Sequence, residues 1–251
     1  MFWLALMLVF QTAFSLLVPN SAPSTRMLMM QSQGDTLISR LPSKIILGSK
    51  SFTRQMIVKE MGMEPIIRVA DIDEKAIGDR SAETGWDPER LVLALGHAKA
   101  DAILESGLQP GDHGLLLTGD QVVVHEGRIL EKPTSLEEAR QFIEGYARAP
   151  PRTVGSAVLT DLATGRRLQG VDTATIRFAP FPPEVVDRLL ADEMTLHCAG
   201  GLMVEHELVQ PYLEGIDGTV DSVMGLSKRL TETLIRRMLN NEEEEGSSPS
   251  S

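Results

Sequence analysis

The chain contains one cysteine, Cys198, among its 251 residues. A single cysteine excludes an intramolecular disulfide and any zinc site built from several cysteines. The five histidines lack the short spacing and the partner acid that zinc ligands usually show. The sequence therefore indicates neither a disulfide framework nor a zinc centre.

Positive charge is scarce as well. The chain has 24 Lys and Arg against 35 Asp and Glu, which gives a net charge of −11. Sequence-independent binding of DNA or RNA depends on cations that neutralise phosphates, so we expect no nucleic-acid partner. A triphosphate substrate is still compatible with this balance if a few placed cations and a metal meet its charge.

A long apolar run lies at the N-terminus, where Gln11, Thr12 and Ser15 are the polar breaks between Phe2 and Leu17. The run is shorter than a comfortable membrane span, and no Lys or Arg precedes it. A targeting segment, a gene-model extension and a membrane anchor all remain open. We expect residues 1–40 to form a targeting-like segment with a flexible spacer, and residues 241–251 a disordered acidic and Ser-rich tail.

The middle of the chain, residues 41–240, is long enough for one large domain or two small lobes around a cleft. Periodicity and capping residues predict helices over 52–61, 88–106, 136–147, 183–192 and 226–239. Strands are predicted over 45–47, 66–70, 115–117, 122–124 and 203–212, with a hairpin from 153–160 and 169–178. This mixture predicts an α/β fold with a mixed sheet.

A small polar loop, Gly48-Ser49-Lys50-Ser51, separates the first predicted strand from the helix that follows. This order presents free backbone N–H groups to an anion. The loop lacks the spacing of a Walker A motif, and a helix capped by a serine is the other interpretation.

Carboxylates occur at two informative places. Asp73 and Glu74 follow a predicted edge strand, where they either hold Mg²⁺ or belong to a solvated acidic loop. Asp120 interrupts the apolar run from Leu115 to Val124. A carboxylate there must be paired, so Asp120 is either a structural hydrogen-bond partner or an active-site group.

Lys99 lies on or beside the apolar stripe of the helix predicted over 88–106. Its ammonium either extends to solvent or reaches a buried anion.

Six short stretches, in this order and spacing, resemble the Maf-like nucleoside-triphosphate pyrophosphatases. They start at Gly48, Asp71, Ala98, Gly119, Glu131 and Leu196. The resemblance extends from Ser43 to Leu239. It implies a Maf/inosine-triphosphatase-like α/β fold, with a long mixed twisted sheet, flanking helices and two lobes around a cleft.

The resemblance also implies an activity: metal-dependent hydrolysis of a nucleoside triphosphate to the monophosphate and pyrophosphate, as house-cleaning of the nucleotide pool. In the family pattern Asp120 matches the proton acceptor. The metal is Mg²⁺ or Mn²⁺, matched by Glu74 and Asp73. The residues that match substrate-binding positions are Ser49, Ser51, Arg54, Lys99 and Lys132.

Three residues match the positions that distinguish substrates in the family: Thr53, Gln121 and Glu205. Gln121 and Glu205 look like the subgroup acting on 7-methyl-GTP, CTP and UTP rather than the dTTP and UTP subgroup. A carboxylate can accept hydrogen bonds from a base and favours a cationic methylated purine. The other interpretation of Glu205 is a surface residue of a strand.

Some residues depart from the family pattern. Phe52 and Thr53 replace Pro and a basic or aromatic residue, and Glu131 replaces the glycine before Lys132. The stretch Asp221–Leu226 is similar to plant-type members. The altered loop supports an alternative, a catalytically impaired nucleotide-binding regulatory protein. The family is cytoplasmic, while the apolar N-terminus leaves organellar or secretory targeting open. A homodimer is possible, and we expect no stable membrane association of the folded domain.

Overall fold

The computed structural model describes residues 41–69, 71–80 and 85–240. The predicted targeting-like segment (1–40) and the tail (241–251) lie outside the described residues.

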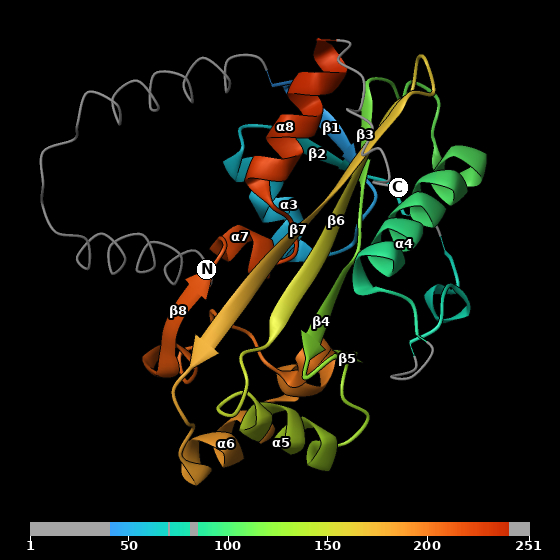
Figure 1. Ribbon diagram of the computed structural model, residues 1–251. Helices are drawn as coiled ribbons and strands as arrows, with labels where there is room; N and C mark the ends of the chain where they lie inside the picture. The colour runs from blue at the N-terminus through green and yellow to red at the C-terminus, as the bar shows by residue number, and fades with distance from the viewer. Residues whose placement is uncertain (1–40, 70, 81–84, 241–251) are drawn as a thin grey trace, which may run out of the picture. The chain divides into compact units, whose positions relative to one another are not determined.

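Eight strands form one mixed sheet with the order β2-β1-β3-β6-β4-β5, and β7 and β8 extend it from β6 (Figure 1). Strand β1 pairs in parallel with β2 and β3, and the other pairings are antiparallel. The strands are β1 (Lys44–Leu47), β2 (Glu64–Ile67), β3 (Leu115–Thr118), β4 (Gln121–His125), β5 (Arg128–Leu130), β6 (Arg152–Asp161), β7 (Arg167–Phe178) and β8 (Leu213–Asp217).

Helices flank this sheet on both faces: α4 covers one face of β6 and β7, while α7 and α8 lie over the other (Figure 1). The α-helices are α3 (Phe52–Glu60), α4 (Pro88–Ala102), α5 (Leu136–Gly145), α6 (Pro183–Leu190), α7 (Val220–Val223) and α8 (Lys228–Leu239). Shorter helical turns are η1 (Glu74–Ala76), η2 (Ile103–Gly107), η3 (Glu193–His197), η4 (Ala199–Gly201) and η5 (Gln210–Tyr212).

Side-chain hydrogen bonds fix where three helices begin. Ser51 accepts from the Arg54 amide at α3, and Asp87 accepts from the amides of the first turn of α4, which starts with a proline. Ser135 caps α5 in the same way. Each cap satisfies an amide that has no partner inside its helix. The three helices begin where the sequence predicted them to begin.

Two large apolar clusters lie toward opposite ends of the β6–β7 hairpin. One contains Leu159 and Leu168 together with Leu234 of α8, and the other contains Ile176 and Phe178 together with residues of α5 and α6. These clusters correspond to the two lobes expected from the sequence.

One predicted element is wrong. Residues 203–212, expected to form a strand, fold instead as turns that end in η5. His206 binds Asp192 through Nε2, and its Nδ1 accepts a hydrogen bond from the Leu208 amide, which bends the chain there. The strand that pairs with β7 follows this segment as β8.

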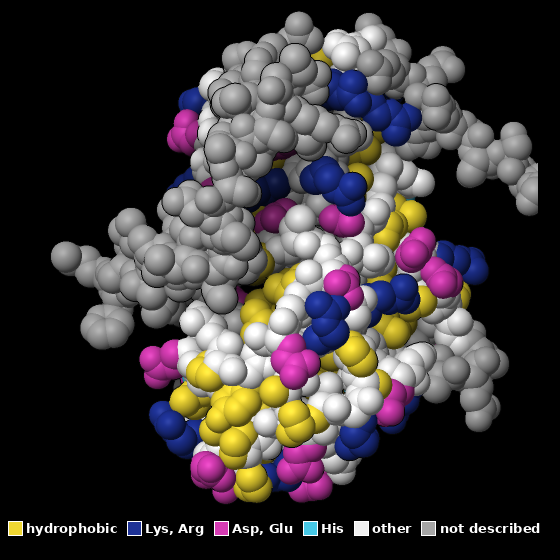
Figure 2. All heavy atoms as spheres, turned by 60° about the vertical axis from the view of Figure 1, so that its left-hand side comes forward, with side chains coloured by type: hydrophobic (Ala, Val, Ile, Leu, Met, Phe, Trp, Pro, Cys, Tyr) yellow, Lys and Arg dark blue, Asp and Glu magenta, His cyan; other side chains and the backbone are white. Residues whose placement is uncertain are grey.

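Charged side chains of both signs are interspersed over the described surface in Figure 2, and apolar side chains gather toward its lower end. Among the described residues in that view, cations form no continuous stripe of the kind that binds nucleic acid. Within the described ranges, no helix has the length and apolarity that a membrane crossing requires.

Candidate functional site

Asp120 lies at a break in a strand that otherwise continues in register. Strands β3 and β4 pair with β6 in the same register, from Thr118 opposite Val158 to Gln121 opposite Gly155. A Cβ atom at Gly119 would lie 2.1 Å from the backbone oxygen of Ser156, so the two strands approach too closely there for any other residue. The break therefore depends on glycine and places a carboxylate inside an apolar strand.

Ser156 holds the backbone of Asp120 on both sides. Its Oγ accepts a hydrogen bond from the Asp120 amide at 3.0 Å, and its own amide donates to the Asp120 carbonyl at 2.8 Å. The Asp120 side chain is 15% exposed. The carboxylate is thus fixed at its base while its oxygens stay within reach of a ligand.

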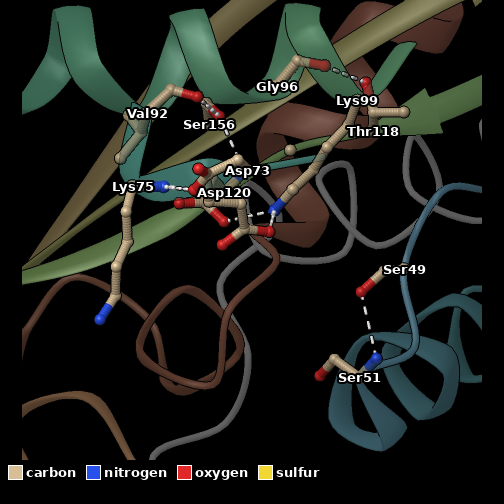
Figure 3. A network of polar contacts seen from close by, with 12 residues as sticks. Ser49, Ser51, Asp73, Lys75, Val92, Gly96, Lys99, Thr118, Asp120 and Ser156 are labelled. Atoms are coloured by element: carbon tan, nitrogen blue, oxygen red, sulfur yellow. Dashed lines mark hydrogen bonds and ion pairs between the residues drawn. The ribbon is translucent and has the colours of Figure 1, made fainter. Parts of the chain in front are cut away.

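The Lys99 ammonium bridges two carboxylates, and Figure 3 shows its contact with Asp120. Its Nζ lies 2.6 Å from Asp120 Oδ1 and 2.9 Å from Glu74 Oε1, and the side chain is 14% exposed. Of the two interpretations left open by the sequence, the ammonium reaches a partly buried anion rather than extending to solvent. Two anions around one cation form the centre of the candidate site.

The position of Lys99 follows from how α4 is fastened to the sheet. Ser156 Oγ donates to the Val92 carbonyl at 2.6 Å, and Thr118 Oγ1 donates to the Gly96 carbonyl at 2.8 Å (Figure 3). A Cβ at Gly96 would lie 2.9 Å from a Val158 methyl group, so the missing side chain lets the helix approach. Ser156 and Thr118 are functional residues that the sequence analysis missed; the available signal was a pair of small hydroxyl residues at buried strand positions.

Arg54 contributes a half-buried guanidinium to the same place. Its Nη1 donates to the Gly119 carbonyl at 2.9 Å, and its Nε donates to the Gly225 carbonyl at 2.8 Å. Burial lowers the pKa of Arg54 from its usual value, while Asp120 and then Glu74 act against that shift. The cation is therefore held between the strand break and the turn after α7, beside the two carboxylates.

The serine loop before α3 is organised by its own hydroxyls. Ser49 Oγ accepts from the Ser51 amide at 3.1 Å, and Ser51 Oγ lies 2.8 Å from Thr53 Oγ1. Figure 3 shows Ser49 and Ser51 on this loop, to one side of the Lys99–Asp120 pair. The helix-cap interpretation is thus seen in the structure, and the phosphate-binding role of the loop stays a prediction.

The carboxylates of Asp73 and Glu74 have different partners. Asp73 Oδ1 accepts from the amides of Lys75 and Ala76 and so caps η1. Glu74 instead points its carboxylate at Lys99. Among the described residues, no group of three or more His, Cys, Asp or Glu side chains lies close enough to hold a metal ion. Glu74 therefore shares the Lys99 ammonium with Asp120, whereas Asp73 caps η1.

Gln121 binds the backbone of α7, and Arg54 binds the turn that follows this helix. Gln121 Nε2 donates to the Ser222 carbonyl at 2.7 Å. Arg54 Nε donates to the Gly225 carbonyl in the turn that follows. Asp221 Oδ2 accepts from the Lys228 amide and joins the turn to α8. The plant-type stretch Asp221–Leu226 therefore supports the site, a role that its sequence alone did not indicate.

Lys132 and Glu205 both lie close enough to Cys198 to act electrostatically on its thiol. Burial, with a contribution from Glu205, raises the pKa of the Cys198 thiol to about 11, while Lys132 acts in the opposite direction. Burial also raises the pKa of Glu205. Lys132 is exposed and, within the described ranges, forms no ion pair with Asp120 or Glu74. The structure thus brings together Asp120, Lys99, Glu74 and Arg54, and within the described ranges Lys132 and Glu205 take no part in these direct contacts.

Comparison with known proteins identifies the family of this chain. The family model described as "Maf-like protein" matches residues 44–238. The chain belongs to the Maf-like family.

Curated relatives span most of the family domain. A 7-methyl-GTP pyrophosphatase of Dictyostelium discoideum is 35% identical over 198 residues, which cover 77% of this chain and 96% of the relative. A nucleoside triphosphate pyrophosphatase of Streptomyces coelicolor is 31% identical, covering 78% of this chain and 89% of the relative. One from Saccharopolyspora erythraea is 30% identical, covering 76% and 92%.

Proposed function

We propose that this chain hydrolyses the α–β phosphoanhydride bond of a nucleoside triphosphate and yields a nucleoside monophosphate and pyrophosphate. The observation that carries the proposal is the Asp120 carboxylate fixed beside the Lys99 ammonium, with Glu74 on the same cation. The names of the curated relatives support the same enzyme class.

Cations in the site would neutralise the triphosphate. Arg54 and Lys99 are already held beside Asp120, where charge develops during the reaction. We assign the outer phosphates to Lys132 and to the hydroxyls of Ser49 and Ser51, following the family pattern.

The donor set fits a hard divalent cation. The oxygens of Glu74 and Asp120 converge on a single positive charge, the Lys99 ammonium. Mg²⁺ is typically bound through one or two carboxylates together with substrate phosphates, so Glu74 and Asp120 would hold Mg²⁺ or Mn²⁺. Asp73 has one oxygen engaged in capping η1 and would contribute less. The bound metal would polarise the phosphate oxygens and screen their charge.

Asp120 acts as the proton acceptor in this proposal. A water loses a proton to Asp120 as its oxygen forms a bond to the α-phosphorus. The bond between that phosphorus and the bridging oxygen breaks, and pyrophosphate leaves. Positioning and charge compensation supply most of the rate gain, since no covalent intermediate is needed.

For the base, we propose a preference for 7-methyl-GTP over unmethylated GTP. Glu205 is a half-buried carboxylate, and its negative charge favours the cationic methylated purine. The relative from Dictyostelium discoideum carries the same substrate in its name. We also propose a cytoplasmic location and a homodimer.

A substrate screen with the purified full chain tests the activity. We expect pyrophosphate and monophosphate in equal amounts from 7-methyl-GTP, CTP or UTP with Mg²⁺ or Mn²⁺, and less from dTTP. Release of orthophosphate alone would contradict cleavage at the α–β bond. Nucleotide binding without turnover would instead support the alternative, a catalytically impaired regulatory protein. The hydroxyls of Ser49 and Ser51 also favour this alternative, because they already form hydrogen bonds within their own loop.

A further inference from the structure

Arg80 joins two loops that are far apart in the sequence. Its Nε lies 2.6 Å from Glu131 Oε1. On the other side, Nη2 donates to the Glu74 carbonyl at 2.8 Å and Nη1 donates to the Ile77 carbonyl at 2.9 Å. All three guanidinium nitrogens are therefore engaged, and the rigid planar group holds both loops in one orientation.

Each of these loops carries a residue of the candidate site. The loop of Arg80 includes Glu74, whose carboxylate binds the Lys99 ammonium. The other loop includes Glu131, which immediately precedes Lys132. The Glu131 carbonyl also accepts a hydrogen bond from the Gly200 amide at 3.0 Å, so the second loop is held from two directions.

Glu131 is one of the departures from the family pattern, which has glycine before the lysine. A glutamate at that position adds the partner that Arg80 binds. The Arg80 side chain is 19% exposed and the Glu131 side chain 44% exposed, so the pair is only partly screened by water.

We propose that the Arg80–Glu131 ion pair positions Lys132 at the triphosphate site by fastening its loop to the loop of Glu74. Arg80 is thus a positioning residue that acts through Lys132 and Glu74. The inference rests on the proposed function, because it concerns how that site is completed. Loops that are already joined lose less freedom when substrate binds, so the ion pair lowers KM more than it changes kcat.

Kinetics of four variants separate positioning from direct substrate contact. Glu131→Gly and Arg80→Ala should each raise KM about fivefold with kcat within about twofold, and the double variant should cost no more than either single one. Arg80→Lys should recover part of the loss, because it keeps the charge opposite Glu131. If Arg80 instead binds phosphate itself, its effect will persist in full in the Glu131→Gly background, and the inference is then wrong.

A matched control is Arg140→Ala. This variant removes an ion pair of equal length, 2.6 Å to Asp187, between α5 and α6. We expect KM to stay unchanged there, whereas a comparable rise in KM would show that loss of any surface ion pair has this effect and would overturn the inference.

Hydrogen exchange tests whether the Arg80–Glu131 ion pair holds the two loops together, and this measurement does not depend on enzyme activity. Glu131→Gly should speed amide exchange around residues 74–77, and Arg80→Ala should speed it around residues 130–133. Absence of this reciprocal effect would overturn the inference whatever the kinetics show. If the reciprocal effect appears but the wild-type chain releases no pyrophosphate, the fastening stands and the proposed function fails.

Discussion

The Lys99 ammonium lies between Asp120 and Glu74, 2.6 Å from one carboxylate and 2.9 Å from the other. These three side chains come from a helix, a strand break and the short helical turn η1, which are separate in the sequence. In the proposed function, this cluster is where a triphosphate and its metal would bind.

Asp120→Asn should reduce kcat by about three orders of magnitude or more, since the amide cannot accept the proton from water. The substitution keeps the size of the side chain and its backbone bonds to Ser156, so the fold should be retained. Steady-state kinetics with 7-methyl-GTP and circular dichroism measure the two effects. Wild-type turnover in this variant would remove Asp120 from the mechanism.

Lys99→Met should lower kcat/KM about a hundredfold, because the charge that meets the phosphates is lost. The side chain keeps a similar length, and Asp120 and Glu74 are left without their shared cation. Lys59→Met, on the exposed side of α3, is the matched control for loss of one lysine. Equal kcat/KM in both variants would place Lys99 outside the substrate site.

Gly119→Ala should destabilise the fold by about 3 kcal/mol, because the new Cβ would lie 2.1 Å from a backbone oxygen that has no room to move. Gly155→Ala provides the comparison within the same strand pair, since its Cβ would lie 3.7 Å from the nearest atom. Urea unfolding of both variants measures the difference. A Gly119→Ala protein as stable as Gly155→Ala would contradict the close approach of the strands.

Glu205 should make both stability and base preference depend on pH. Burial raises its pKa in the folded chain, so the folded state binds this proton more tightly than the unfolded state. The cost of the buried charge is therefore present above the folded pKa and is relieved as pH falls through it. Over the same range, preference for the cationic 7-methylguanine should weaken, because Glu205 becomes neutral.

Glu205→Gln is the control for this pH dependence. Its 7-methyl-GTP to GTP ratio of kcat/KM should vary less with pH than that of the wild-type chain, and its Tm should lack the Glu205 contribution. An unchanged pH profile in Glu205→Gln would show that this carboxylate does not contact the base.

The sequence predicted those parts of the site that depend on local chemistry. A carboxylate in an apolar run required a partner, and Asp120 has one in Lys99. The cap at Ser51 could be identified because its pattern spans only a few residues. The roles of both in catalysis and phosphate binding stay predictions.

Contacts that depend on tertiary register could not be predicted in this way. The bond from Gln121 to the Ser222 carbonyl joins residues 101 positions apart, and nothing in either local pattern indicates the other. The segment around Glu205 was predicted to be a strand, but the hydrogen bonds of His206 fold it into turns. The predicted strand was wrong there because a histidine side chain binds a nearby backbone amide and an aspartate fourteen residues earlier in the chain.

The segment Ser222–Gly225, which contains the end of α7 and the turn after it, has a consequence for how the protein is made. It supplies the backbone acceptors for Gln121 and for the Arg54 guanidinium. During synthesis from the N-terminus, the strand break and α3 emerge from the ribosome long before these acceptors exist. A nascent chain that stops short of residue 225 therefore lacks the backbone acceptor that holds the Arg54 guanidinium beside Asp120, so the candidate site is assembled only after residue 225 has been added.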